Sequence, residues 1–156
     1  MKKTTLCYLT HQNDVLMILR NKKKNDENKD KYIGLGGHFL PGETPEECVI
    51  REVFEESGIN LSAPRYCGIV TFHSDIYPSE EMHLFSKELQ VRPILPACNE
   101  GTLCFLSTEQ LFSVNMWEGD RIFLSLLFEN APFFHLTLRY EGENLISATL
   151  NDQKIK

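Results

Sequence analysis

Three glutamates at helical spacing are the side chains in this sequence best suited to chemistry. Glu55 and Glu56 follow Glu52 by three and four positions, so a helix would place all three carboxylates on one surface. Like charges at this spacing repel one another, and Arg51 can offset only one of them, through Glu55. A hard cation such as Mg²⁺, or Mn²⁺, would relieve the conflict because it prefers carboxylate oxygens. A solvated acidic helix face is the alternative interpretation.

A glycine-rich segment lies just before these glutamates. Residues 34–38 read Gly-Leu-Gly-Gly-His, with three glycines in four positions. Glycine allows positive φ angles and lets the backbone approach a ligand closely, so such a loop can turn carbonyl groups toward a cation. Taken alone, the segment is equally compatible with an ordinary turn.

The residues around the glutamates predict a well-defined helix. Thr44 is a suitable N-cap, Pro45 suits the first helical position, and Glu47 completes a capping box. Gly58 marks the end of the helix. The predicted apolar face consists of Val49, Ile50, Val53 and Phe54.

The elements that must position this helix are mostly strands. Alternating or apolar runs predict strands at residues 4–10, 15–20, 66–72, 82–90, 102–106, 133–140 and 144–150. A second helix is expected over residues 120–128. At 156 residues the chain can bury a sizeable core without disulfides or structural zinc. We therefore expect residues 1–156 to form a single α+β domain with a mixed sheet and helices packed against it.

A lysine-rich segment separates the second predicted strand from the glycines. Residues 21–31 are almost wholly charged or amide side chains, and five of them are lysines. Two interpretations are open: a solvated surface loop, or a loop whose lysines attract a phosphate chain.

Overall composition limits the classes of partner that the protein is expected to bind. A formal charge of −6 argues against a stable nucleic-acid complex, because phosphate backbones are held mainly by clustered lysine and arginine. The longest apolar run, residues 122–128, is far shorter than the ~20 residues of a membrane span. Five cysteines without a C-x-x-C pair, and no signal-like N-terminus, favour reduced thiols in a cytoplasmic protein. Cys48 is expected in the core. Nothing in the sequence indicates an oligomeric state.

Taken together, the glycine loop and the helix form a known pattern. Gly37, five residues, Glu43, seven residues and then Arg-Glu-Val-Phe-Glu-Glu-Ser-Gly-Ile over residues 51–59 resemble the Nudix box at every specified position. The resemblance implies the Nudix fold, an α/β/α sandwich with a mixed β-sheet. It also implies hydrolysis of a nucleoside diphosphate linked to another group.

Carried over by position, the resemblance implies roles for the residues of the box. The implied metal ligands are the carboxylates of Glu52, Glu55, Glu56 and Glu100 and the carbonyl of Gly36. Glu100 is alternatively the general base, and the choice among Glu52, Glu56 and Glu100 stays open. Arg51 would orient the carboxylates. Glu43 and Gly58 would support the motif structurally, while Gly37 and His38 would contact phosphate.

Likeness outside the box points to one branch of the family. Trp117 with Asp120, the Asn99–Glu100 pair and residues 133–150 resemble MutT-like enzymes, which remove oxidised purine nucleotides such as 8-oxo-dGTP. The implied products are a nucleoside monophosphate and pyrophosphate, which protects the nucleotide pool and hence DNA. Trp117 would stack on the purine, Asp120 would hydrogen-bond its edge, and Phe72 would form a wall. A core role for Trp117 and an N-cap role for Asp120 are the structural alternatives.

Three positions depart from the MutT-like pattern. Ile33 replaces an asparagine found in some oxidised-purine enzymes, Gly119 replaces one of two consecutive acids, and His38 replaces the usual lysine. The first two leave room for another nucleotide substrate, such as ADP-ribose, a nucleotide sugar, a dinucleotide or capped RNA. A nucleotide-binding regulator without catalysis is a further alternative.

Overall fold

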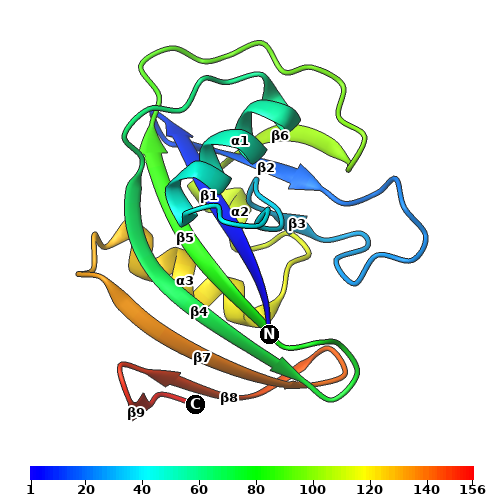
Figure 1. Ribbon diagram of the computed structural model, residues 1–156, viewed down its shortest axis with the longest axis vertical. Coiled ribbons are helices and arrows are strands. Elements are labelled where there is room, and N and C mark those ends of the chain that lie inside the picture. Colours follow the sequence, from blue (N-terminus) through cyan, green and yellow to red (C-terminus); the bar gives the residue numbers. More distant parts are fainter.

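A nine-stranded mixed sheet forms the centre of the computed structural model, which describes all 156 residues (Figure 1). The strands are β1 (Lys2–His11), β2 (Asp14–Leu19), β3 (Tyr32–Ile33), β4 (Arg65–Ser74), β5 (Glu80–Glu88), β6 (Thr102–Ser107), β7 (Phe134–Glu141), β8 (Asn144–Leu150) and β9 (Gln153–Lys154). The helices are α1 (Pro45–Ser57), α2 (Thr108–Leu111) and α3 (Glu118–Phe128).

The strand order is β3-β2-β1-β5-β4-β7-β8-β9, with β6 also paired to β2. The pairs β1–β5 and β4–β7 are parallel, and the other pairs are antiparallel. Helix α1 covers one face of the sheet while α2 and α3 lie behind the other, as Figure 1 shows. The predicted α+β fold with a mixed sheet, an α/β/α sandwich, is confirmed.

Each face of the sheet has its own apolar core. On the α1 side, Val49 and Val53 are fully buried and pack in one cluster with β1, β2 and β5 side chains such as Leu9 and Phe85. On the opposite side, Phe123 anchors α3 against β1, β4 and β7. The two cores fix α1 and α3 on opposite faces, and members of both, such as Phe72 and Ile33, also line the cavity described below.

Helix α1 begins and ends as the sequence predicts. The Glu47 amide donates to Thr44 Oγ1 at 3.1 Å, and the Thr44 amide donates back to Glu47 Oε1 at 2.9 Å. Gly58 adopts φ 74° and ends the helix. One expectation for the apolar face is wrong: Phe54 is 52% exposed, because the buried stripe follows Val49 and Val53 and turns away from it.

Other differences occur where elements are short. Helix α3 begins at Glu118, so its N-cap residue is Trp117, and Asp120 lies inside the first turn instead of capping the helix. Strands β3 and β9 have two residues each and α2 has four, too few to show a hydrophobic period. The position of β3 is set by its pairing with β2, in which Ile33 lies opposite Ile18.

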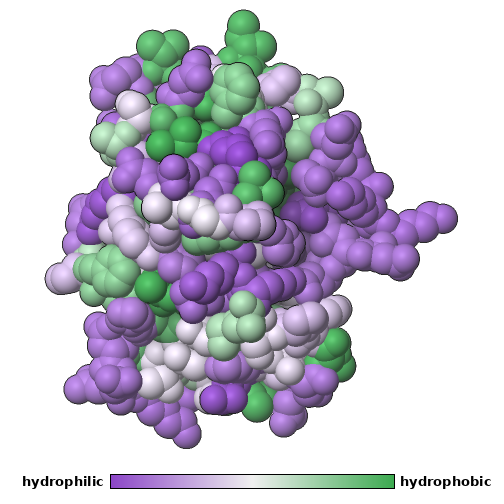
Figure 2. Space-filling view, in the orientation of Figure 1, coloured by the Kyte–Doolittle hydropathy of each residue, from purple (hydrophilic) through white to green (hydrophobic).

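The remaining predictions concern surface and cysteines. The 21–31 segment protrudes from the body as a hydrophilic lobe in Figure 2. None of the helices is long and apolar enough to cross a membrane. All five cysteines are free, and Cys48 is fully buried, as predicted.

Candidate active site

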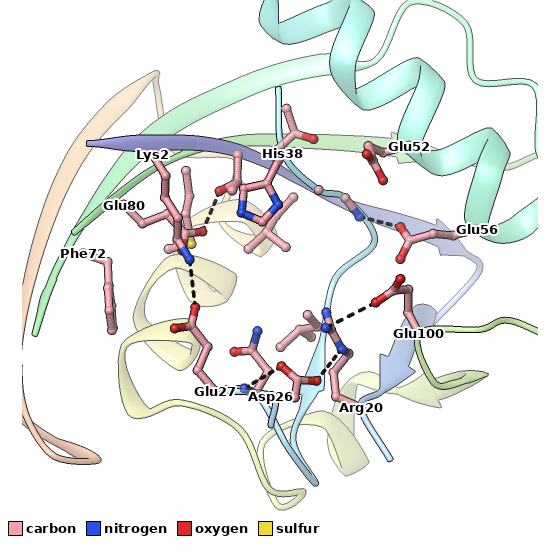
Figure 3. Close-up of a pocket in the computed structure, with 18 of the residues that line it drawn as sticks. Lys2, Arg20, Asp26, Glu27, His38, Glu52, Glu56, Phe72, Glu80 and Glu100 are labelled. Carbon is pink, nitrogen blue, oxygen red and sulfur yellow. Dashed lines mark hydrogen bonds and ion pairs between the residues drawn. The ribbon is translucent and has the colours of Figure 1, made fainter. Parts of the chain in front are cut away.

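A cavity of about 850 Å³ lies between α1 with its glycine loop and the 21–31 segment. Figure 3 shows Glu52, Glu56 and Glu100 at one end and Phe72 at the other. We call the first the carboxylate end, formed by Glu52, Glu55, Glu56 and Glu100, and the second the aromatic end, formed by Phe72, Trp117, Asp120 and Tyr140. All the predicted site residues except Arg51, Glu43 and Gly58 line this one cavity.

The glutamates of α1 differ in burial because they face different directions around the helix axis. The Glu55 side chain is 57% exposed and the Glu52 side chain 17%, whereas Glu56 is 7% exposed. Glu56 Oε1 accepts a 2.7 Å hydrogen bond from the Gly36 amide. The most buried carboxylate is therefore fixed against the glycine loop.

Burial raises the pKa of Glu56 to about 8, with Glu52 and Glu100 adding negative charge, while the Gly36 amide and Arg20 act in the opposite direction. A carboxyl group in this position binds a proton near neutral pH unless another cation takes its place.

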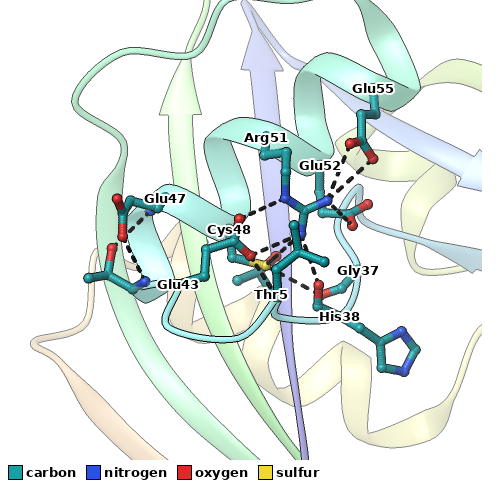
Figure 4. Close-up of polar contacts among 11 residues, drawn as sticks. Thr5, Gly37, His38, Glu43, Glu47, Cys48, Arg51, Glu52 and Glu55 are labelled. Atoms are coloured by element: carbon teal, nitrogen blue, oxygen red, sulfur yellow. Dashed lines mark hydrogen bonds and ion pairs between the residues drawn. The ribbon is translucent and has the colours of Figure 1, made fainter.

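Arg51 organises the other carboxylates from outside the cavity (Figure 4). Its Nε and Nη2 donate to the two oxygens of Glu43 at 2.7 and 2.9 Å. Its Nη1 donates to Glu52 at 2.8 Å and to Glu55 at 3.3 Å. The predicted pairing with Glu55 is present, and the guanidinium additionally holds Glu52, so one cation orients two of the three helix carboxylates.

Glu43 is held in this network by hydrogen bonds from Arg51 and the Leu40 amide. The hydrogen bonds from Arg51, aided by the Leu40 amide, lower the pKa of Glu43 to about 2. The Leu40 amide donates to Glu43 Oε1 at 2.9 Å, and Arg51 Nη2 donates to the His38 carbonyl at 3.0 Å. Glu43 and Arg51 thus tie the loop before α1 to the helix.

Gly36 and Gly37 lie so close to neighbouring atoms that a larger residue would not fit at either position. A Cβ on Gly37 would lie 2.5 Å from the Glu52 carboxyl carbon, and one on Gly36 would lie 1.8 Å from the Thr5 carbonyl oxygen. Side chains at either position would displace the loop or the carboxylate. His38, by contrast, is exposed at the cavity wall.

Glu100 reaches the carboxylate end from the loop before β6. Arg20 Nη2 lies 3.4 Å from its carboxylate, and Lys23 Nζ lies 3.0 Å from it. Arg20 also donates to Asp26 at 2.9 Å, while Lys22 donates to the Cys98 carbonyl at 2.6 Å. Some cations of the predicted lysine segment therefore hold that segment to the Glu100 loop.

The carboxylates are gathered but do not form a closed metal cluster. No group of three or more His, Cys, Asp or Glu side chains has the spacing to hold an ion. Glu52 and Glu55 are paired with Arg51, and Glu100 with Arg20 and Lys23. The donors are all oxygens, the type that Mg²⁺ and Mn²⁺ prefer, and Glu56 lies buried beside like charges. The donor set fits a hard divalent cation.

Trp117 is the centre of the aromatic end. It is 6% exposed, and its ring makes edge contacts with Phe72 and Tyr140 at centroid distances of 5.9 and 5.1 Å. Lys31 Nζ lies 4.5 Å from the ring centroid, and its ammonium also pairs with Glu143. The indole is therefore held both by packing and by a cation over its face.

Asp120 supplies a polar group among these rings. It is 6% exposed, lines the cavity, and its carboxyl oxygens accept no hydrogen bond from the protein. Burial raises its pKa to about 8; Glu80 adds to the rise, and Arg121 and Lys31 oppose it. A neutral carboxyl both donates and accepts hydrogen bonds, so it is suited to reading a ligand edge.

Several cavity residues had no signal in the sequence. Lys2 bridges Glu27 and Glu80 at 3.3 Å each, and Thr4 Oγ1 donates to Glu80 at 2.6 Å. These residues come from separate segments without a motif, and only the pairing of β1 with β5 brings Lys2 opposite Glu80. Figure 3 shows the ion pair between Lys2 and Glu27 crossing the cavity.

Comparison with known proteins identifies the family of this chain. The NUDIX domain family matches residues 2–127. The uncharacterized Nudix hydrolase YvcI of Bacillus subtilis (strain 168) is 27% identical over 161 residues, covering 100% of this chain and 98% of that protein. The oxidized purine nucleoside triphosphate hydrolase of Mus musculus is 26% identical over 136 residues, covering 86% of each chain.

A solved structure extends the likeness to the whole fold. The mutator MutT protein from Bacillus halodurans has a TM-score of 0.84 at 21% identity, covering 97% of this chain and 98% of that one. The family match spans most of the sequence and includes β1, the glycine loop and α1. This chain therefore belongs to the Nudix family of hydrolases, which act on nucleotide derivatives, and its relatives include MutT-like proteins.

Proposed function

We propose that this Nudix hydrolase is a divalent-metal-dependent nucleoside triphosphate diphosphatase that converts oxidised purine nucleotides, such as 8-oxo-dGTP, to the monophosphate and pyrophosphate. The observation that carries the proposal is one cavity with a carboxylate end and an aromatic end. A nucleoside triphosphate has the same division, with a polyanionic chain at one end and a flat aromatic base at the other. We also infer that residues 1–156 act as one domain, because a single sheet spans β1 to β9.

At the carboxylate end, the proposed ligands for Mg²⁺ or Mn²⁺ are Glu52, Glu55, Glu56, Glu100 and the Gly36 carbonyl. A bound ion would neutralise phosphate charge and lower the pKa of a water molecule. Arg51 keeps Glu52 and Glu55 oriented through its hydrogen bonds. One carboxylate then accepts the proton of the attacking water, and Glu52, Glu56 and Glu100 are all placed in the same cavity for that role.

Hydrogen-bond donors beside the carboxylates would help to hold the phosphate chain. Lys23 and Arg20 line the cavity next to Glu100, and His38 is exposed on the opposite wall. Gly37 leaves room for close approach because a Cβ there would already collide with Glu52. These groups bind and position the substrate.

At the aromatic end, Phe72 and Trp117 would contact the base while Asp120 hydrogen-bonds its edge. The support is the buried, unpartnered carboxyl of Asp120 facing a cavity walled by aromatic rings. A relative named as an oxidized purine nucleoside triphosphate hydrolase covers 86% of the chain, which favours oxidised purines.

A matched substrate panel tests the proposal. Release of pyrophosphate and monophosphate is measured with Mg²⁺ for 8-oxo-dGTP, dGTP, ADP-ribose, a diadenosine polyphosphate, a UDP-sugar and capped RNA, with a chelator control. We expect the highest kcat/KM for 8-oxo-dGTP and no turnover with the chelator. Preference for another substrate would retain the metal-dependent chemistry and overturn the assignment of oxidised purines.

The panel also separates an enzyme from a regulator. If no compound is hydrolysed but nucleotides raise the melting temperature, the chain is a nucleotide-binding protein without catalysis. Retention of every acid of the box favours the enzyme.

A further inference from the structure

The lysine-rich segment sends one uncharged side chain into the aromatic end. Asn28 lines the cavity, and its Oδ1 accepts a 2.8 Å hydrogen bond from Trp117 Nε1. Asn28 and Trp117 are 89 residues apart in sequence, so no spacing pattern links them. This contact joins the segment to the residue that precedes helix α3.

The indole contact fixes the orientation of the Asn28 amide. An indole N–H is only a donor, so it must face the carbonyl oxygen of the amide. The amino group, Nδ2, is consequently directed away from Trp117 Nε1, and it makes no hydrogen bond within the protein. An oriented donor without a protein partner is thus left at the aromatic end.

The backbone around Asn28 is also held in place. Its amide donates to Asp26 Oδ1 at 3.0 Å, and its carbonyl accepts from the Lys31 amide at 2.9 Å. Asp26 is in turn paired with Arg20 at 2.9 Å. The donor is therefore preorganised, which lowers the entropy that a ligand contact would otherwise cost.

We propose that Asn28 is a specificity-determining residue whose Nδ2 donates a hydrogen bond to a carbonyl oxygen on the base, so that oxopurines are selected over 6-aminopurines. The inference rests on the proposed function and deepens it. Asn28 reaches the base from the 21–31 segment, whereas Asp120 reaches it from α3. A 6-amino group presents a donor to Nδ2 and leaves it without an acceptor, which is the kind of mismatch that produces strong discrimination.

An isosteric substitution distinguishes recognition of the base by Asn28 Nδ2 from the hydrogen bond between Asn28 Oδ1 and Trp117. Asn28→Asp keeps an oxygen for the indole and replaces the amino donor with an acceptor. Asn25→Asp is the matched control, because Asn25 lies in the same segment, lines the same cavity and gains the same charge. Asn28→Ala removes both the donor and the oxygen. Trp117 is the only tryptophan, so its fluorescence reports directly on this contact.

The primary readout is binding, measured by Trp117 fluorescence without divalent metal for 8-oxo-dGMP, dGMP and dAMP. We expect Asn28→Asp to weaken binding of the two oxopurines by about 10-fold or more relative to dAMP, because a hydrogen bond is lost and an acceptor faces the carbonyl. Emission of the free protein should shift in Asn28→Ala, because the indole N–H loses its acceptor. Asn25→Asp should change binding of all three nucleotides by one common factor.

Two outcomes would overturn the inference. Equal weakening for every base in Asn28→Asp would show a charge effect only, and an unchanged oxopurine preference would show that Nδ2 does not read the base. Turnover of 8-oxo-dGTP and dATP, measured separately, tests the proposed function. If the wild-type protein turns over neither nucleotide but still prefers oxopurines in binding, and Asn28→Asp removes that preference, Asn28 keeps its role and catalysis is refuted.

Discussion

The two ends of the cavity are built in different ways. The carboxylate end comes mainly from one helix and the loop before it, residues 36–56, with Glu100 added from a second loop. The aromatic end combines β4, β7, the 21–31 segment and the start of α3. Residue spacing within one helix and its preceding loop therefore determines most of the carboxylate end. The aromatic end forms only when the sheet brings distant segments together.

Each end contains a buried carboxyl group with a raised pKa, and the two groups have different neighbours. Glu56 and Asp120 both have a pKa of about 8, and burial is the largest cause in each case. Glu56 has carboxylates as neighbours, so a cation would restore its negative charge. Asp120 lines the cavity together with Phe72 and Tyr140 and is suited to remain neutral and donate a hydrogen bond.

The largest effect is expected from neutralising a carboxylate at the carboxylate end. We expect Glu56→Gln to lower turnover by about 100-fold or more, because loss of a metal ligand removes charge neutralisation and water activation together. The increase in melting temperature on adding Mg²⁺ should also shrink, since binding to the folded state is lost. Steady-state kinetics and thermal unfolding with and without Mg²⁺ measure both effects.

Glu46→Gln is the control, because Glu46 is exposed on the same helix and lies outside the cavity. It should keep wild-type turnover and the wild-type response to Mg²⁺. Wild-type turnover in Glu56→Gln would remove Glu56 from the proposed metal site.

The local structure of helix α1 could be predicted from the sequence for a physical reason. The capping box, the Gly58 terminus and the pairing of Arg51 with Glu55 depend on residues within one helical turn of each other or on a backbone rule for glycine. Such features are visible in a linear sequence. The hydrogen bond from Arg51 to the His38 carbonyl could not be predicted from spacing, because it requires the loop to fold back on α1, whereas the contact with Glu52 joins neighbouring residues of α1.

At the aromatic end, the sequence identified residues but not their surroundings. Phe72, Trp117 and Asp120 do line one cavity. Lys31 over the indole and Tyr140 beside it were not predicted, since they come from distant segments. Asp120 was also considered as an N-cap, and the helix instead begins two residues earlier, which turns its carboxyl into the cavity wall.

A smaller effect is expected from Asp120→Asn, and it depends on pH. The unfolded carboxyl has a pKa near 3.8 and the folded one about 8, so between these values the folded state binds more protons. Stability from this group is therefore present at low pH and lost as pH rises toward 8. Asp120→Asn has no carboxyl group here and does not lose this stability. The difference in melting temperature between the variant and wild type should therefore increase from pH 5 to pH 8 and stay constant above pH 8.

Thermal unfolding of both proteins at several pH values gives this difference directly, at about 2–4 °C for each kcal/mol. Parallel curves would show that Asp120 is not held neutral. In the substrate panel, the same variant should change base preference more than maximal rate; a uniform loss across nucleotides would argue against base reading.

The smallest effect is expected where charge only assists packing. Lys31→Met removes the ammonium over Trp117 and its pairing with Glu143, whose side chain is 64% exposed, but keeps a similar apolar stem. The loss should be about 1 kcal/mol or less, since the Lys31 side chain is buried and an apolar replacement also removes the desolvation cost of its ammonium, while a single cation–π contact contributes little. Urea unfolding measures the stability change, and turnover should stay within a few-fold of wild type. A loss of turnover as large as that of Glu56→Gln would mean that the aromatic end, like the carboxylate end, depends on charge, and the contrast between the two ends would fail.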